Sequence, residues 1–257
     1  MRDIVQNHMM QLLSLVAMEP PTSLSAGAIR DEKVKVLQSI RPFTLQDFEE
    51  KIVRGQYASG YINGKSVIAY REEENVSPLS QRETYVALSL HIDNWRWASV
   101  PFYLRSGKRL PKRVTEIAII FKDSPGFLFQ AQGKHPDRNV LAIRIQPDEG
   151  IALKINCKVP GPSSPIQPVK MDFRYGSYFG KTAPEAYERL ILDCMAGDST
   201  LFARSDEVAK SWEIWTPLLQ YWETHPAKDF PNYAAGSWGP LATDQMIARQ
   251  GHSWRML

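Results

Sequence analysis

The sequence predicts an α+β domain, in which helices pack on one face of a large, mainly antiparallel sheet. Helical periodicity occupies both ends of the chain, whereas the middle switches to alternating or β-rich runs. The links between these runs are short and rich in turn residues, as in Gln146-Pro-Asp-Glu-Gly150. Parallel strands need crossovers of about a dozen residues or more, so these links favour antiparallel neighbours.

The first twenty residues predict an amphipathic helix that ends at Pro20-Pro21. Asp3, Asn7 and His8 lie off its apolar stripe, on the free face. Such an aspartate and histidine can belong to a site, because histidine exchanges a proton near neutral pH. On periodicity alone a structural or surface position is the better interpretation of His8, because a lone histidine is weak evidence for a site. The stripe comprises Val5, Met9, Leu12, Leu13 and Val16.

A second helix is predicted over residues 25–39, with Ser25 as its cap and Arg41-Pro42 ending it. The middle of the chain then predicts strands of one sheet, because residues alternate or are β-branched. These strands cover residues 84–92, 114–121, 140–146, 151–157 and 169–173.

Helical periodicity returns over residues 186–195 and 206–222. Ser205 is the expected cap of the second of these helices, and Pro217 is expected to bend or divide it. The tail from Pro226 is rich in Pro, Gly, Trp and Tyr, which predicts irregular packing.

Composition fits one domain over residues 1–257, since 43% of the residues are hydrophobic and no clear linker interrupts the chain. The net charge of +3 is spread evenly and indicates no nucleic-acid surface. A basic cluster from Arg105 to Arg113 is the exception, and it suits an anionic small molecule as well as a polymer.

Two widely spaced cysteines, Cys157 and Cys194, predict a reduced cytoplasmic setting rather than a disulfide framework. No stretch reaches the ~20 apolar residues of a membrane span, and the first helix lacks the organisation of a secretory signal. We therefore expect no membrane association.

Other chemistries find little support in the sequence. The five histidines form no close pair, so no local metal motif is present. There is no Gly-x-Ser-x-Gly elbow for a nucleophilic serine. Gly60 and Gly64 lack the third glycine and the following helix that a phosphate cradle needs.

Seven ordered segments instead resemble the glucose-6-phosphate dehydrogenase family, over essentially the whole chain. The first, Arg2-Asp-Ile-Val-Gln-Asn-His8-Met-Met-Gln followed by Ala17-Met-Glu-Pro-Pro21, resembles the helix that carries the family's catalytic histidine. The others are Lys51-Ile-Val-Arg-Gly-Gln-Tyr57, Trp97-Ala-Ser-Val-Pro-Phe-Tyr-Leu-Arg-Ser-Gly-Lys108, Arg144-Ile-Gln-Pro-Asp-Glu149, Ala186-Tyr-Glu-Arg-Leu-Ile-Leu-Asp193, Arg204-Ser-Asp-Glu207 and Ser237-Trp-Gly-Pro240.

The resemblance implies that His8 is the base that takes the proton from the C1 hydroxyl of the sugar while a hydride leaves C1. Asp3 matches a residue that accepts hydrogen bonds from sugar hydroxyls, although an acid near a helix N-terminus is also favoured by the helix dipole. Lys108 matches a lysine that reaches the substrate, and without the resemblance a solvated basic turn is the better interpretation. Arg113 and Gln146 match two further positions near the sugar phosphate.

Two segments of the family are missing from this sequence: the glycine-rich turn of the dinucleotide fold, and a segment like Arg-Ile-Asp-His-Tyr-Leu-Gly-Lys that holds the sugar phosphate and supplies the aspartate orienting the base. The resemblance therefore implies a C-terminal half that is truncated at its N-terminus, with NADP bound mainly by an absent N-terminal domain. We expect such a chain to be inactive alone.

A second, structural NADP is held against the sheet in some family members. Arg105, Lys154 and Asp172 match that pattern, and Arg144 partly matches a nucleotide contact, but Val114 and Ala118 stand where basic partners are expected. The resemblance also implies a homo-oligomer, dimer or tetramer, formed through the sheet. The alternative function is a non-catalytic module that binds or dimerises with full-length subunits.

Overall fold

We analysed a computed structural model, which describes residues 1–123, 137–161, 166–180 and 186–257. Its helical elements are η1 (Ile4–Met9, a π-helix), α1 (Met10–Ala17), α2 (Ala26–Gln38), α3 (Leu45–Glu50), η2 (Tyr70–Glu72, 3₁₀), α4 (Tyr175–Phe179), α5 (Ala186–Ala196), α6 (Ser205–Thr224) and α7 (Leu241–Ala248). Its strands are β1 (Ile52–Gly55), β2 (Tyr57–Ala58), β3 (Gly60–Ile62), β4 (Lys65–Val67), β5 (Tyr85–His91), β6 (Pro101–Gly107), β7 (Thr115–Ile120), β8 (Val140–Gln146), β9 (Gly150–Lys158), β10 (Ile166–Arg174) and β11 (Tyr233–Ala234).

The chain divides into two compact units. The first comprises Met1–Pro111 and Ala186–Met256, and the second comprises Lys112–Glu185 with Leu257. That residues 1–257 form one domain stays a prediction.

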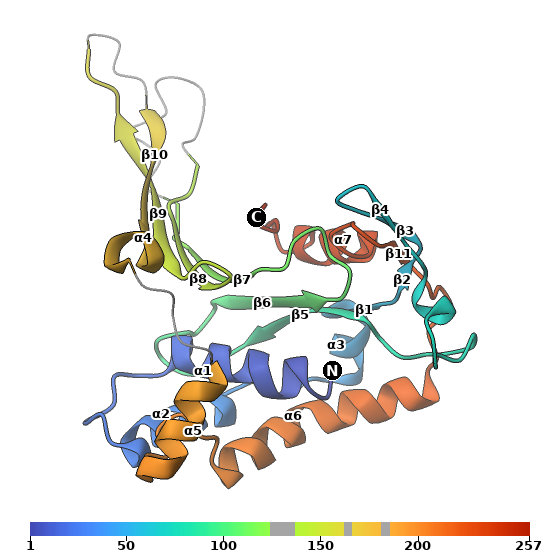
Figure 1. The fold of residues 1–257 in the computed structure, drawn as a ribbon, viewed down its shortest axis with the longest axis horizontal. Coiled ribbons are helices and arrows are strands. Elements are labelled where there is room, and N and C mark those ends of the chain that lie inside the picture. The colour runs from blue at the N-terminus through green and yellow to red at the C-terminus, as the bar shows by residue number, and fades with distance from the viewer. Residues whose placement is uncertain (124–136, 162–165, 181–185) are drawn as a thin grey trace. The chain divides into compact units, whose positions relative to one another are not determined.

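The first unit is built around a three-stranded antiparallel sheet of order β1-β5-β6, shown in Figure 1. All residues of the central strand β5 from Tyr85 to Leu90 are buried, because both faces of the sheet are covered. Val86, Leu88 and Leu90 join the core formed with α1, α2, α3 and α6. Tyr85 and Ala87 face the other way and pack with Met246 of α7.

Helix α6 supplies the centre of the larger core. Trp215 and Leu218 are fully buried there, and they pack with Val5 of η1 and Leu37 of α2. Complete burial of such side chains contributes roughly 1.5–3 kcal/mol each. The N-terminal helix that carries His8 is thus fixed along its inner side by α6 and α2.

The second unit contains a four-stranded antiparallel sheet of order β10-β9-β8-β7. Its register places like residues side by side, since Ile117, Ile143, Ile151 and Phe173 are aligned across the four strands, and so are Ile119, Leu141, Leu153 and Met171. The neighbouring rows hold Arg144, Lys154 and Asp172. One face of this sheet is therefore apolar, and the other combines these charged residues with alanines, of which Ala142 and Ala152 are buried.

These observations confirm the α+β class and the antiparallel pairing. The prediction of a single sheet for the five strands is wrong, because 85–91 pairs in the first unit and the other four strands pair in the second. Helices also cover both faces of the first sheet rather than one. The backbone that follows β6 is hydrogen-bonded to the C-terminal part of the chain. The carbonyl of Lys108 accepts from the Tyr233 hydroxyl (2.9 Å), and the carbonyl of Arg109 accepts from the Gly236 N–H (2.7 Å).

Helix 25–39 is confirmed as α2, with Ser25 as its cap, and helix 186–195 is confirmed as α5. The cap of α6 is Arg204 and not Ser205, because Glu207 accepts from the Arg204 N–H. Residues 205–224 form one helix across Pro217, whose ring is exposed. The tail includes α7, where the sequence predicted irregular structure.

No helix in the described part of the chain combines the length and the apolar composition that crossing a membrane requires.

Candidate functional site

The first helix begins with a wide turn that the periodicity did not predict. Residues Ile4–Met9 form a π-helix, in which the N–H of His8 reaches the carbonyl of Asp3 (3.4 Å). An extra residue in the turn shifts everything after it around the helix axis. The buried positions are consequently Val5, Met10, Leu13 and Ala17, whereas Met9, Leu12 and Val16 are only partly buried. The predicted stripe is thus confirmed at Val5 and Leu13, and it is wrong at Met9, Leu12 and Val16, where Met10 and Ala17 are the buried residues instead.

The wide turn brings Asp3 and His8 together. Nε2 of His8 lies 3.5 Å from Oδ1 of Asp3, and both side chains are open to solvent, with exposed fractions of 62% and 75%. In a regular α-helix, residues five apart point about 140° from each other. The π-helix therefore creates this pair on the free face, where the sequence placed both residues but not next to each other.

Lys108 lies directly after β6, on a backbone that is held from three sides. Its N–H donates to the carbonyl of Thr84 (2.8 Å), its carbonyl accepts from Tyr233, and Gly107 before it packs against the Tyr85 ring. A Cβ at position 107 would approach Cδ2 of Tyr85 to 2.5 Å, so packing requires the glycine. The Lys108 side chain is exposed, and within the described residues no hydrogen bond or ion pair engages its ammonium.

The next residue, Arg109, anchors this turn. It adopts a left-handed backbone (φ 54°), and its guanidinium donates to Oε1 of Glu73 (3.0 Å). The hydroxyl of Tyr57 donates to the same oxygen (2.5 Å), which holds the pKa of Glu73 below its usual range, with the Arg109 contact acting in the same direction. Burial and the Glu73 carboxylate raise the pKa of Tyr57 to about 12, so the hydroxyl stays a donor.

The site helix, formed by η1 and α1 with Asp3 at its start and His8 within it, begins near the backbone of Lys108. The amino group of Met1 lies 3.0 Å from Oε1 of Glu83, and the next residue, Thr84, accepts the N–H of Lys108. The core around Val5 of η1 also includes Leu104 of β6. The start of η1 and the backbone of Lys108 thus both lie next to the Glu83–Thr84 segment of the first unit.

Arg113 and Gln146 lie in the second unit, at one end of its sheet. Gln146 pairs with Thr115 across β7 and β8, and Arg113 precedes Thr115 by two residues. Both side chains are exposed. The structure therefore groups these two residues with each other and Asp3 with His8.

The residues that matched a nucleotide site are engaged within the chain. The Arg105 guanidinium lies over the Trp238 ring (5.1 Å) and the Trp254 ring (4.6 Å). In the second unit, Lys154 pairs with Asp137 (2.7 Å), and Arg144 pairs with Asp172 (2.8 Å).

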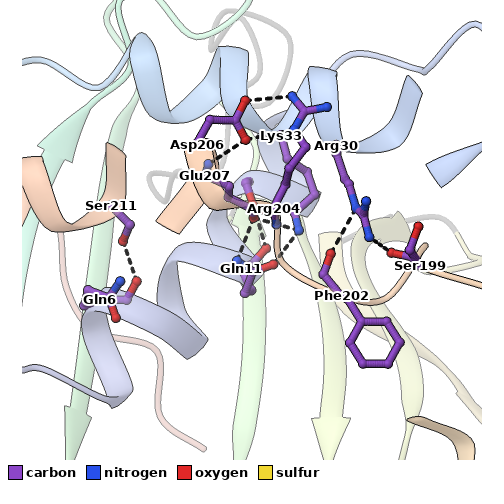
Figure 2. A network of polar contacts seen from close by, with 11 residues as sticks. Gln6, Gln11, Arg30, Lys33, Ser199, Phe202, Arg204, Asp206, Glu207 and Ser211 are labelled. Atoms are coloured by element: carbon purple, nitrogen blue, oxygen red, sulfur yellow. Dashed lines mark hydrogen bonds and ion pairs between the residues drawn. The ribbon is translucent and has the colours of Figure 1, made fainter. Parts of the chain in front are cut away.

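Sequence reasoning missed a buried polar cluster, shown in Figure 2, that joins α1, α2 and α6. The Glu207 carboxylate is 2.7 Å from Nζ of Lys33, and these side chains are only 1% and 8% exposed. Glu207 also accepts from Nε2 of Gln11 (2.6 Å). The Arg204-Ser-Asp-Glu207 segment signals a helix start, but a buried charge leaves no mark in hydropathy.

Within the residues that the structure describes, no group of three or more His, Cys, Asp or Glu side chains could hold a metal ion. Three kinds of group in the first unit are exposed and chemically versatile. These are an imidazole that can accept a proton, a carboxylate that can accept hydrogen bonds from hydroxyls, and an ammonium that can bind an anion.

The structure thus shows an α+β fold whose site helix carries an exposed acid at its start and an exposed imidazole. The family model for the glucose-6-phosphate dehydrogenase C-terminal domain matches residues 1–255. The chain belongs to this family.

Individual relatives agree. Over 260 residues, 58% are identical to a glucose-6-phosphate 1-dehydrogenase of Chlamydia pneumoniae, covering 100% of this chain and 50% of the relative. The Bacillus subtilis enzyme of that name is 46% identical, with 99% and 52% covered. The chain therefore spans about half the length of these curated relatives.

Solved structures share the fold. A glucose-6-phosphate dehydrogenase in complex with its substrate glucose-6-phosphate is 37% identical, with a TM-score of 0.85 over 99% of this chain and 51% of that chain. The Mycobacterium avium glucose-6-phosphate 1-dehydrogenase is also 37% identical, with a TM-score of 0.79 over 99% of this chain and 50% of that chain.

Proposed function

We propose that this chain forms the substrate-binding and oligomerising part of a glucose-6-phosphate 1-dehydrogenase. The whole enzyme oxidises D-glucose 6-phosphate to the 6-phosphoglucono-lactone with NADP, the first step of the oxidative pentose phosphate pathway. The observation that carries the proposal is the solvent-exposed His8–Asp3 pair, together with the exposed Lys108, whose ammonium has no bonded partner among the described residues. The family and the relatives named above support it.

In this proposal His8 accepts the proton of the C1 hydroxyl while the hydrogen on C1 leaves with its bonding electron pair as a hydride. Asp3 accepts hydrogen bonds from sugar hydroxyls and orients the ring beside the imidazole. Lys108 binds the anionic substrate through a mobile point charge. Arg113 and Gln146 remain candidates for contact with the sugar phosphate on the family resemblance alone. NADP supplies the hydride acceptor.

A Gly-rich dinucleotide turn is missing from this sequence, so we assign NADP mainly to a separate N-terminal domain. The chain's own basic candidates are occupied by Trp238, Trp254 and carboxylates, which argues against Arg105, Arg144 and Lys154 as its main holders. The chain alone is therefore expected to leave NADP unreduced.

We also propose a cytoplasmic location and a homo-oligomer. Both cysteines, Cys157 and Cys194, are free, as a reducing compartment keeps them. The apolar face of the β7–β10 sheet leaves Ile151, Val169 and Met171 41–50% exposed, which suits a second copy of the chain. The same face would serve the alternative function, a non-catalytic dimerisation module.

The test is His8→Asn in the chain fused to the dinucleotide-binding half of a relative. The asparagine keeps a polar side chain but cannot take a proton, so kcat for NADP reduction should fall at least about 100-fold. His225→Asn is the matched control, because His225 is an exposed histidine that stacks on Tyr221.

A near-parental kcat for His8→Asn would return His8 to a structural role. A fusion that folds and dimerises but shows no turnover even with His8 present would favour the non-catalytic module.

A further inference from the structure

Side chains of α6 form hydrogen bonds with the buried side of the π-turn at residues 4–9 and of the residues just after it. Residues Gln6 and Gln11 are five apart, like Asp3 and His8, and both contact α6: Ser211 donates its hydroxyl to the Gln6 carbonyl, and Gln11 donates to Glu207. Figure 2 shows these two contacts next to each other along the site helix. Gln6 makes its contact through its backbone carbonyl and Gln11 through its side chain, and the π-turn adds one residue between these two points of contact.

Glu207 and Ser211 are four residues apart on α6, so they share one face of a regular helix. On α6 the two partners are therefore one α-helical turn apart. On the site helix the residues that they contact, Gln6 and Gln11, are five apart, which is the spacing of a π-helical turn. A regular α-helix at residues 4–9 would carry one of the two partners away from α6.

Ser211 also takes over a role that the backbone gives up. In a regular α-helix the N–H of Met10 would reach the Gln6 carbonyl, but here it points to the carbonyls of Val5 and Asn7. The Ser211 side chain is buried, as is Gln6, so water offers little replacement for this donor. The hydroxyl of Ser211 thus satisfies the buried Gln6 carbonyl, which has lost its usual α-helical backbone donor in the π-turn.

We propose that Ser211 and Glu207 are positioning residues, which hold the π-turn and thereby place His8 beside Asp3. The contribution of these residues to catalysis rests on the function proposed above, whereas their hold on the turn does not. Neither side chain touches the substrate surface, since both contact the opposite side of the site helix. Their effect is transmitted through the backbone of residues 4–11.

Hydrogen exchange of the 257-residue chain tests the hold directly. Ser211→Ala should accelerate exchange of the amides in residues 4–11 by about tenfold, while β5 and α7 keep their parental rates. Gln11→Met removes the contact with Glu207 and also the hydrogen bond that Gln11 accepts from Lys33, but it leaves the Glu207–Lys33 pair, and it should act on the same amides. Ser211→Thr keeps the hydroxyl and should restore protection.

The matched control is Thr216→Val. Thr216 is on the same helix and donates its hydroxyl to the carbonyl of Trp212, so this variant removes a hydroxyl without touching the site helix. Unchanged exchange in residues 4–11 for Ser211→Ala would overturn the proposal. Equal acceleration everywhere in the chain would also overturn it, because it would show a merely global loss of stability.

Turnover of the fused enzyme separates this proposal from the proposed function. If both stand, Ser211→Ala lowers kcat about tenfold or more, and Thr216→Val does not. In one outcome, Ser211→Ala accelerates local exchange while neither Ser211→Ala nor His8→Asn changes turnover. That outcome supports the positioning role of Ser211 in the π-turn and refutes the proposed function. A loss of turnover in His8→Asn with unchanged exchange in Ser211→Ala does the reverse.

Discussion

The proposed site residues combine a fixed backbone with a free side chain. Asp3 and His8 are held by the π-turn, and Lys108 is held through its own N–H and carbonyl, yet all three side chains are exposed. Ordering the backbone in advance lowers the entropy lost when a ligand binds. This is the arrangement expected of residues that bind something outside the chain.

Lys108→Ala should weaken the binding of glucose 6-phosphate in the fused enzyme. Loss of one charge-assisted contact corresponds to a rise in KM of about 10- to 100-fold, with a smaller change in kcat. The measurement is the dependence of initial rate on substrate concentration. Lys65→Ala, at an exposed lysine of β4, is the control, and an unchanged KM for Lys108→Ala would argue against contact with the substrate.

Glu73→Gln should destabilise the chain near neutral pH but not in acid. Because Tyr57 and Arg109 hold the pKa of Glu73 below 4.5, folding favours the ionised carboxyl. Its stabilising contribution is therefore complete above the unfolded pKa and disappears as pH falls through the lower, folded pKa. The urea midpoints of parent and variant should differ at pH 7 and converge below about pH 4.

Glu74→Gln provides the comparison for that series. Glu74 is an exposed neighbour of Glu73, so its replacement should leave the midpoint nearly unchanged at every pH. A gap between parent and Glu73→Gln that persists undiminished at pH 3 would contradict the ionised-carboxyl explanation.

At the scale of elements, α6 is the organising helix. Its apolar side centres the core through Trp215 and Leu218, and its first turns carry the Glu207 cluster. Removing Glu207 would leave Lys33 buried without its charge partner, a change that typically costs about 3–5 kcal/mol. The site helix thus depends on α6 for both packing and polar contacts.

Pro217→Ala should stabilise α6. Proline has no N–H to donate to the carbonyl of Glu213, and a proline inside an exposed helix lowers the free energy of unfolding by about 3 kcal/mol. Part of this loss is offset because proline also restricts the unfolded chain. We expect the free energy of unfolding to rise by about 1–2 kcal/mol in urea titrations. Pro226→Ala, just beyond the helix, should give no gain, and a destabilised Pro217→Ala would show that the ring has a packing role.

At the scale of the whole molecule, the second unit has an apolar sheet face on which Ile151, Val169 and Met171 are 41–50% exposed. The aligned rows of Ile, Leu, Met and Phe on the β7–β10 sheet are partly open, whereas the opposite face carries ion pairs such as Arg144–Asp172. Apolar sheet faces are normally covered. We expect a second copy of the chain to contribute to that cover.

Met171→Lys should therefore shift the chain from dimer toward monomer in sedimentation velocity experiments. Met171 is 50% exposed, so the charge is tolerated in the monomer but not in an apolar interface. Lys170→Gln lies next to it on the other face and should leave the dimer intact. A parent chain that is monomeric at tens of micromolar would contradict this prediction.

Local sequence was enough for much of the fold. Ser25 capping α2, the helix at 186–195 and the strands of the second unit were predicted from periodicity and turn residues, because neighbouring residues decide them. The division into two sheets was not predicted. The backbone that follows β6 is instead hydrogen-bonded to Tyr233 and Gly236, which come more than a hundred residues later in the chain, and no local pattern signals such contacts.

The sequence by itself determined the class of the protein, the family resemblance and the identities of Asp3, His8 and Lys108 as candidates, because these depend on residue type and order. Only the tertiary structure decided that Asp3 and His8 form a pair. A π-turn leaves no periodic signal, and this one is supported by Ser211 and Glu207, which are about 200 positions away in the chain. Contacts between distant segments select such a turn, so no local pattern could have predicted it.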